Sequence, residues 1–242
     1  DPRVRKAFSL AIDRTYIVNQ VTQSGQIEAG GFVPSGVYDA DGAAGDDFRT
    51  VGGDYYKPTD ADYEANCDEA RKLLADAGYP NGEGFPVVEY LYNTSDAHKA
   101  VAEALQFMWE EELGVKVTLN NQEWAAFLQT RKDGDYSISR NGWIADYNDP
   151  ISFLDMWMTG GGNNDAQYAN DDYDALIKQA KTTTDNAERM DLLHQAEDKL
   201  IGEDSVLAPL YFYTQKYMLA DGIGGMYYCP LGYFFFGYTH QA

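Results

Sequence analysis

The sequence predicts an α/β fold built on a mostly parallel sheet flanked by helices. Between residues 87 and 140, three stretches with strand character alternate with two stretches of helical periodicity. The connections are short, and glycines follow both helical stretches. A βαβαβ order of this kind implies right-handed crossovers and parallel neighbouring strands. We therefore expect one open sheet to be the framework of the chain.

Helical patterns dominate the residues before this sheet. Asp1, followed by proline, is typical of a helix start, and an apolar stripe extends that helix over Val4–Val21. Residues 30–57 are rich in Gly, Asp and Pro and predict a long irregular segment. A second helix is expected over Asp60–Ala77, where Gly78 ends it.

The sheet itself is expected to combine three strands with two crossover helices. The strands are predicted at 87–92, 115–119 and 136–140, and the helices follow Ser95 up to Gly114 and run over 123–132. In such sheets, ligands sit beyond the carboxyl ends of the strands. The segment with His98 follows the first strand, and the segment from Arg140 onward follows the third. Both segments should therefore meet at the same rim.

The remaining elements follow Pro150. We expect a short helix around residues 153–157, a flexible polar rim at 160–164, helices at 171–181 and 185–200, and an apolar strand at 206–213. From Asp221 onward the chain is rich in Gly, Tyr and Phe and has little periodicity. This pattern favours strands that pair with something outside their own segment.

The composition excludes several classes of function. The 242 residues carry a net charge of −21, so the surface repels phosphate backbones and anionic lipid headgroups. Nucleic-acid binding and peripheral membrane docking are therefore not expected, and no run of about twenty apolar residues suggests a membrane span. No signal peptide is visible, and the start resembles a cut inside a longer protein. Cys67 and Cys229 are compatible with one disulfide or with two buried thiols.

Catalytic motifs are missing from the sequence. There is no HExxH or G-x-S-x-G pattern, and the three histidines lie far apart, so no nucleophile–base set can be assembled. No metal or cofactor is expected. One enzymatic alternative remains, in which Asp146 and Asp149 act as paired carboxylates of a hydrolase. Solvated loop charges or helix caps explain the same pair more simply.

The sequence instead offers groups that can hold a ligand without reacting, and several of them lie in the loop Arg140–Pro150. Asp146 can accept hydrogen bonds from an ammonium group. Carboxylate binding suits Arg140, Arg131 and His98, and arginine is favoured because its guanidinium is a planar fork. The expected apolar walls are Trp143, Trp124 and Tyr213. The simpler interpretation is an ordinary loop in which Trp143 packs inward and Asp146 caps the next helix.

Several motifs together resemble one known family. They include the helix at 4–14, the block at 73–79, the segments at 92–98 and 121–131, the loop at 142–150, and the pair Asn163–Asn164 with Tyr168. Over residues 2–213 the chain resembles the C-terminal two-thirds of the extracytoplasmic oligopeptide-binding proteins that feed ABC importers.

The resemblance implies a fold and a domain organisation. The fold would be one lobe of a type II periplasmic-binding-protein-like molecule. Residues 1–215 would form the C-terminal peptide-binding lobe, without the N-terminal domain that closes over the ligand. Residues 216–242 would form a tail that normally returns to that missing domain. The protein would be a monomer, periplasmic or at the cell surface, with any membrane contact through a lipid anchor or the transporter.

The resemblance also implies a function and a role for each site residue. The protein would bind short peptides and deliver them to ABC transporter permease subunits, without catalysis. Asp146 would bind the peptide ammonium, and Arg140, Arg131 and His98 would serve its carboxylate. Trp124, Trp143 and Tyr213 would line side-chain pockets, and Asn163 joins the ligand-binding set. A sugar, nickel or haem ligand is the alternative within the same class.

Overall fold

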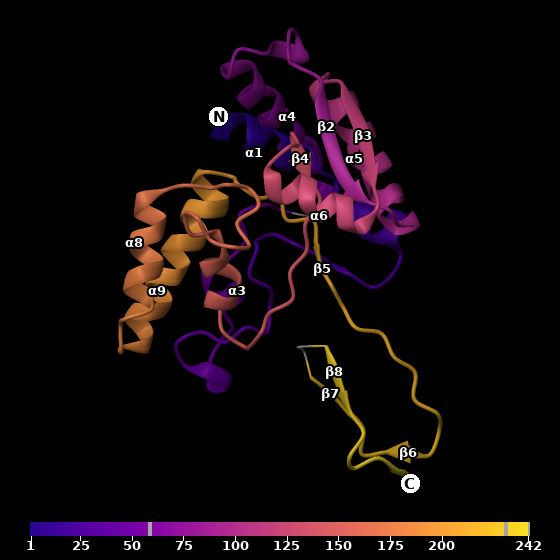
Figure 1. Ribbon diagram of the computed structural model, residues 1–242, viewed down its shortest axis with the longest axis vertical. Helices are drawn as coiled ribbons and strands as arrows, with labels where there is room; N and C mark the ends of the chain where they lie inside the picture. Colours follow the sequence, from indigo (N-terminus) through magenta and orange to yellow (C-terminus); the bar gives the residue numbers. More distant parts are fainter. Residues whose placement is uncertain (58–59, 230–231, 242) are drawn as a thin grey trace.

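A three-stranded parallel sheet lies at the upper right of the molecule in the computed structural model (Figure 1), which describes residues 1–57, 60–229 and 232–241. Strand β2 (Val88–Asn93) is central, between β3 (Val117–Gln122) and β4 (Ile138–Ser139). Both neighbours pair with β2 in parallel. The predicted parallel βαβαβ arrangement is therefore confirmed, although the third strand is shorter than the sequence indicates.

Two helices provide the crossovers between these strands. Helix α5 (Asp96–Leu113) connects β2 to β3, and α6 (Trp124–Asp133) connects β3 to β4. Each ends at a glycine in the left-handed region, Gly114 at φ 66° and Gly134 at φ 74°, as the sequence predicts. The buried Trp109 of α5 donates from its indole nitrogen to the Phe8 carbonyl at 2.8 Å, which ties the crossover to the first helix.

The N-terminal helix is shorter than predicted. Helix α1 (Pro2–Leu10) stops before Ile12, and α2 (Arg14–Tyr16) continues as a π-helix over Ile17–Thr22. The Asp13 carboxylate accepts from the Tyr16 amide at 2.7 Å, so it caps a new helix and interrupts the predicted continuous one. The buried Arg14 then donates to the Pro209 carbonyl at 2.7 Å and joins this corner to the C-terminal part of the chain.

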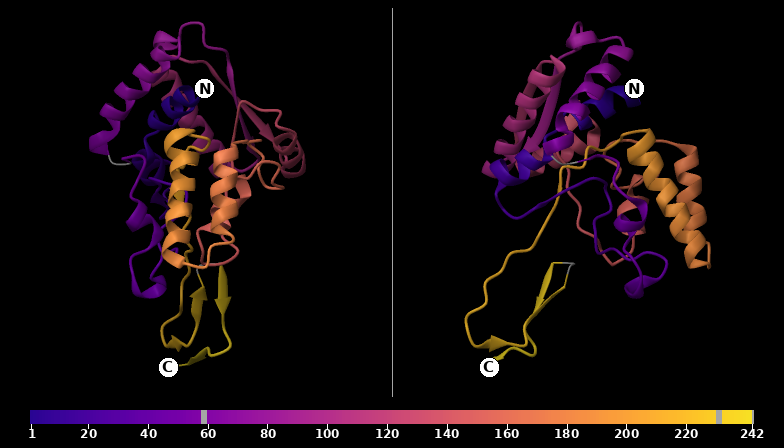
Figure 2. Two further views of the ribbon diagram at one scale, coloured as in Figure 1. Left: turned by 90° about the vertical axis from the view of Figure 1, so that its left-hand side faces the viewer. Right: turned by 180° about the vertical axis from the view of Figure 1, so that it is seen from behind.

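The other helices surround the irregular segment. They are η2 (Gly42–Ala44), α3 (Phe48–Gly52), α4 (Asp60–Asp76), η3 (Pro80–Gly82), α7 (Ile151–Leu154), η4 (Asp155–Trp157), α8 (Asp171–Ala180), α9 (Asn186–Glu197) and η5 (Asp198–Glu203). Helices α8 and α9 lie side by side, away from the sheet (Figures 1 and 2). Asn170 and Asp185 cap them through their side chains, as the sequence predicts. No helix in the described part of the chain is both long and apolar enough to cross a bilayer.

A buried ion pair connects α9 to the irregular segment. Glu197 is 0% exposed, and its Oε1 lies 2.8 Å from Nη1 of Arg49. The same oxygen accepts from the backbone amides of Phe32 and Val33, each at 2.9 Å. Nearby, His194 pairs with Asp39 at 2.7 Å and its ring stacks on Phe48, so this histidine is part of the packing. The irregular residues are thus held by side chains of α9.

The predicted strand at 206–213 is largely wrong. Only β5 (Tyr211–Phe212) has strand geometry, and it pairs antiparallel with β1 (Ile27–Glu28). Residues 205–210 have no regular secondary structure, and the Leu210 carbonyl accepts from the Ala29 amide at 3.2 Å. The apolar run reflects contact with the core, because Val206, Leu207 and Leu210 pack against it.

Beyond Tyr213 the chain projects away from the body (Figures 1 and 2). Strand β6 (Ile223–Gly224) pairs with β9 (His240–Gln241), and β7 (Tyr227–Cys229) pairs with β8 (Tyr233–Phe235). Within this chain the tail strands pair with one another. Pairing of the tail with a domain outside this chain stays a prediction. Residues 230–231 and 242 of the predicted tail lie outside the described residues.

The two cysteines are both free thiols. Cys67 is buried in α4, where desolvation raises the pKa of its thiol to about 11. Cys229 is half-buried in the tail. The disulfide that the sequence left open is therefore not formed in this structure.

Candidate functional site

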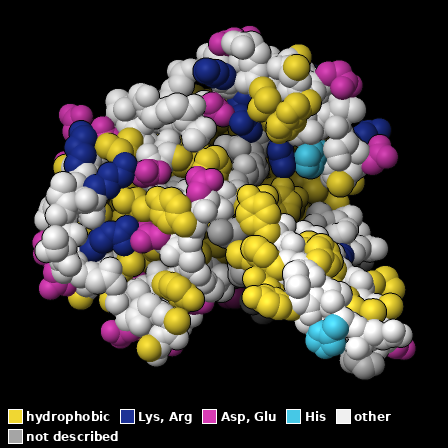
Figure 3. Space-filling view, turned by 60° about the horizontal axis from the view of Figure 1, so that its bottom comes forward, with side chains coloured by type: hydrophobic (Ala, Val, Ile, Leu, Met, Phe, Trp, Pro, Cys, Tyr) yellow, Lys and Arg dark blue, Asp and Glu magenta, His cyan; other side chains and the backbone are white. Residues whose placement is uncertain are grey.

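A large cavity of about 1420 Å³ lies between the body and the tail, because Tyr228, Cys229 and Gly232 of the tail line it together with body residues. Its wall includes the segment that follows β4, the irregular residues near Phe32, and the chain around Tyr211. In the space-filling view the surface is hollowed where hydrophobic side chains gather (Figure 3). The cavity is large enough for a ligand bigger than a typical small molecule, since such pockets usually measure about 300–1,000 Å³.

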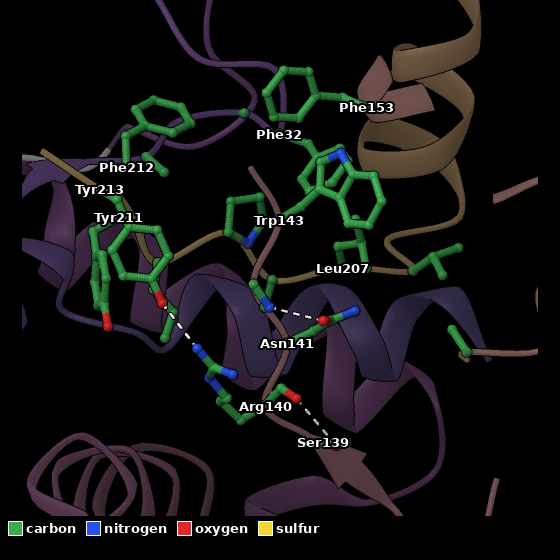
Figure 4. Close-up of a pocket in the computed structure, with 18 of the residues that line it drawn as sticks. Phe32, Ser139, Arg140, Asn141, Trp143, Phe153, Leu207, Tyr211, Phe212 and Tyr213 are labelled. Atoms are coloured by element: carbon green, nitrogen blue, oxygen red, sulfur yellow. Dashed lines mark hydrogen bonds between the residues drawn. The ribbon is translucent and has the colours of Figure 1, made fainter. Parts of the chain in front are cut away.

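Arg140 lies on this wall directly after β4. Its backbone amide donates to the Leu91 carbonyl at 2.9 Å, which fixes the residue to the central strand. Its guanidinium Nη2 donates to the Tyr213 hydroxyl at 3.0 Å (Figure 4). Within the described part of the chain, Arg140 has no carboxylate partner. It is therefore a positive charge available to an anionic group in the cavity.

His98 lies on the same wall, in the first turn of α5. Burial and the positive charge of Arg140 lower its pKa below the usual value. The imidazole is therefore neutral near pH 7, and it offers a hydrogen bond where Arg140 offers a charge. The two residues line the same cavity, in agreement with the sequence prediction that they meet at one rim.

Arg131 also lines the cavity, but it is already paired. Its Nε lies 2.7 Å from Oδ2 of Asp165, and both side chains are only 14% exposed. Its Nη1 donates to Asn141 Oδ1 at 2.9 Å, and its guanidinium lies over the Phe127 ring at 5.1 Å. Sequence reasoning missed Asp165, because no local pattern links it to an arginine 34 positions earlier.

The loop between Arg140 and Pro150 is anchored at several points. The Trp143 indole donates to the Ser152 carbonyl at 2.7 Å, and the Asp146 amide donates to Ser152 Oγ at 2.9 Å. The Asp146 side chain is exposed and lies outside the cavity lining, whereas Ala145 and Tyr147 are part of it. Asp146 therefore stands at the edge of the cavity, and its carboxylate has no partner among the described residues.

The Asp149 side chain, and not that of Asp146, contacts the first turn of α7, whose N-cap residue is Pro150. Asp149 Oδ1 accepts from the Ile151 amide at 2.9 Å. Both of its oxygens also accept from the Arg189 guanidinium, each at 2.8 Å. A carboxylate bound in this bidentate manner has its oxygens engaged and is poorly placed as a nucleophile or base. The geometry thus disfavours Asp146 and Asp149 as a hydrolytic pair.

The remaining predicted site residues divide into two groups. Tyr213 and Trp143 line the cavity, as the sequence predicts. Trp124 is 53% exposed, stacks on Phe127 and lies outside the lining. Asn163 is exposed and also lies outside it. The cavity therefore unites Arg140, His98, Arg131, Trp143 and Tyr213, and it does not include Trp124, Asn163 or Asp146.

The residue after Asn163 has a structural role that the sequence did not indicate. Asn164 is buried, and its amide nitrogen donates to the carbonyls of Met158 and Tyr168 at 3.0 and 2.7 Å. Its Oδ1 accepts from the Tyr168 amide at 3.0 Å. The predicted flexible rim at 160–164 therefore ends in a turn that a buried side chain fixes.

Unpaired backbone groups occur along the cavity wall. Among the described residues, the amides and carbonyls of Trp143, Ile144 and Ala145 have no hydrogen-bond partner. All three residues line the cavity. Backbone groups of this kind require partners when they are covered, and another extended main chain can supply them.

The charges around the cavity differ from those of the rest of the chain. The sequence contains 39 acidic residues, yet Asp165 is the single carboxylate-bearing residue in the described lining. Arg5, Arg131 and Arg140 face the same space. Because Arg5 is bonded to the Asp204 carbonyl and Arg131 to Asp165, Arg140 is the least compensated of the three. The cavity therefore favours an anionic group beside Arg140.

The fold and the open cavity define the class as one lobe of a type II periplasmic binding protein. The structure of Listeria monocytogenes OppA bound to peptide superposes with a TM-score of 0.79 at 28% identity, covering 100% of this chain and 45% of that one. The predicted fold class is thereby confirmed.

The family follows from the sequence comparison. Residues 1–165 match the bacterial extracellular solute-binding proteins, family 5 Middle, and the chain belongs to this family. The dipeptide-binding protein DppE of Bacillus subtilis is 39% identical over 95% of this chain and 40% of its own length. The periplasmic oligopeptide-binding protein OppA of Salmonella typhimurium is 38% identical over 93% and 39%. The chain thus spans about 40% of the length of these relatives.

Proposed function

We propose that this chain is the ligand-binding lobe of a protein that binds short peptides outside the cytoplasm and delivers them to an ABC importer. The observation that carries the proposal is the run of unpaired backbone groups at 143–145 beside Arg140. Main-chain hydrogen bonds give affinity for any peptide, whatever its side chains, and the arginine fixes one end. The peptide-binding relatives support the same assignment.

In this proposal the peptide ends are held by opposite charges. Arg140 binds the terminal carboxylate, and neutral His98 adds a hydrogen bond. The unpaired, exposed Asp146 carboxylate receives the ammonium group at the cavity edge. Trp143 and Tyr213 cover the peptide body. Trp124 and Asn163 stay in the proposed set only as residues that a longer ligand, or closure by a second domain, would bring into contact.

The domain organisation is part of the proposal. Residues 1–215 form the lobe, and residues 216–242 reach toward a second domain that closes over the peptide. The exposed aromatic residues of the tail, such as Tyr233 at 65% and Phe236 at 64%, support this arrangement because large exposed apolar patches mark interaction surfaces. The protein is then a periplasmic or cell-surface monomer, lipid-anchored or free, that contacts permease subunits and carries out no reaction.

Calorimetry with tri-alanine tests the function on the protein at its full natural length. We expect binding of the free peptide and a large loss of affinity for the N-acetylated, C-amidated form, because both end charges are then removed. Chromatography of the peptide after incubation should recover it intact. Peptide cleavage, or equal binding of the blocked peptide, would contradict the proposal. The isolated 242-residue chain should bind more weakly, since the second wall is absent.

A further inference from the structure

Asp165 occupies an unusual position in this acidic chain. It is the one carboxylate-bearing residue in the described cavity lining, among 39 acidic residues in the sequence. Its side chain is 14% exposed and lies 2.7 Å from the equally covered Arg131. An exposed ion pair contributes little, but removing one partner from a pair shielded from solvent leaves the other charge uncompensated, which is costly. The positive charge of Arg131 is thus cancelled inside the cavity.

The turn around Asp165 fixes its position. The buried Asn164 side chain bonds to backbone groups on both sides of the turn, and the Tyr136 hydroxyl donates to the Asp165 carbonyl at 2.7 Å. Gln167 donates to the Asp133 carbonyl at 3.2 Å, at the end of the helix that carries Arg131. These bonds involve backbone groups, so the turn does not depend on the Asp165 carboxylate.

We propose that Asp165 sets the charge preference of the cavity by occupying Arg131, so that the protein selects peptides with a single carboxylate group at this wall. The inference rests on the proposed peptide-binding function and makes it more specific. Arg140 remains for the terminal carboxylate. A second carboxylate, from a glutamate or aspartate side chain of the ligand, must displace Asp165 or remain unpaired, and acidic peptides are therefore not favoured.

The test compares matched peptides in the full-length protein. The dissociation constants of Ala-Ala-Glu and Ala-Glu-Ala are measured by calorimetry against those of Ala-Ala-Gln and Ala-Gln-Ala. In the wild type, the Glu peptides should bind no more tightly than the Gln peptides. In Asp165→Asn, at least one Glu peptide should gain about tenfold over its Gln partner, the change that one hydrogen bond to a charged group supplies.

Two control variants separate the local effect from general ones. Asp165→Glu restores the carboxylate and should restore the wild-type preference. Asp191→Asn removes the same charge from an exposed site on α9, far along the chain from the cavity lining, and should leave the Glu/Gln ratio unchanged. If the Glu/Gln ratio changed in both Asp165→Asn and Asp191→Asn, the net charge of the protein alone would explain the peptide preference. This result would overturn the proposal.

The other possible results of these measurements also bear on the proposal. An unchanged Glu/Gln ratio in folded Asp165→Asn overturns the role of Asp165 but leaves peptide binding intact. If that variant does not fold, the wild type decides, because a Glu peptide that binds about tenfold more tightly than its Gln partner shows Arg131 to be available. Absence of binding for every peptide overturns the proposed function itself.

Discussion

Residues 1–213 and the tail beyond them use similar side chains in opposite ways. The body encloses its large aromatic residues, with Trp109 and Trp157 each 2% exposed. The tail presents hydrophobic side chains on its surface (Figure 3). Its aromatic residues Tyr238 and Phe236 are 77% and 64% exposed. The comparison shows that the body supplies its own core, whereas the tail surface suits contact with another surface.

The cavity wall is the exception within the body. Among the described residues, Arg140 has no carboxylate partner, and the backbone groups of residues 143–145 have no hydrogen-bond partner. Unsatisfied groups of this kind do not add to stability, and they are expected where a ligand binds. The four predictions below test the contrast between the self-contained body, its open wall and the tail.

The largest effect is expected at the buried ion pair of the body. Glu197→Ala leaves Arg49 and two backbone amides without their acceptor, and should lower the free energy of unfolding by about 3–5 kcal/mol. Chemical denaturation measures this change. The control is Glu203→Ala, whose side chain is 65% exposed, with an expected change within about 0.5 kcal/mol. Equal effects of the two substitutions would show that the body is less self-contained than we infer.

The second effect is expected on peptide affinity, at the cavity wall that carries Arg140. Arg140→Gln removes the proposed carboxylate partner, and should weaken tri-alanine binding about tenfold to a hundredfold. The free energy of unfolding should change by no more than about 0.5 kcal/mol, since Arg140 has no carboxylate partner among the described residues. Calorimetry and denaturation measure the two quantities. Lys132→Gln, on the exposed side of α6, is the charge-matched control and should retain affinity.

A smaller effect is expected from His98. Its folded-state pKa lies below the usual value because of burial and Arg140, so as pH falls the unfolded chain takes up this proton first. This histidine therefore contributes stability above about pH 6.5, its ordinary pKa, and loses that contribution as pH falls through the folded-state value. An NMR titration should show a lowered His98 pKa that rises in Arg140→Gln. A pKa that does not respond would mean that the two side chains do not face each other.

The smallest effect is expected from the tail. Ending the 242-residue chain after Gln215 should change the free energy of unfolding by less than about 1 kcal/mol, because the tail strands pair with one another. Self-association measured by light scattering should fall, since the exposed aromatic residues are removed. A loss of stability comparable to that of Glu197→Ala would contradict the division between body and tail.

The sequence predicted those parts of the fold that depend on local chemistry. Gly114 and Gly134 end the crossover helices, and Asn170 and Asp185 begin α8 and α9, because each acts on its own neighbours. The prediction of one continuous N-terminal helix was wrong at Asp13. There the Asp13 side chain caps a new helix although the apolar stripe continues. The predicted strand was also wrong at residues 206–210, where an apolar run packs on the core without forming a strand.

The site was predicted less completely, for a related reason. The sheet topology placed His98 and Arg140 at one rim, and the structure agrees. The pairing of Arg131 with Asp165 could not be found, because it joins two segments whose approach depends on packing between them. The exposure of Trp124 was equally inaccessible, since aromatic character alone does not tell which way a helix face points.

The buried Asn164 has a consequence for how such proteins diversify. Because its amide secures the bend through main-chain atoms, the path of the bend does not depend on the side chain of the neighbouring Asp165. One codon there can make the adjoining wall acidic, neutral or basic while the backbone keeps its path. The path of the bend and the charge of this wall are thus set by two neighbouring side chains, Asn164 and Asp165.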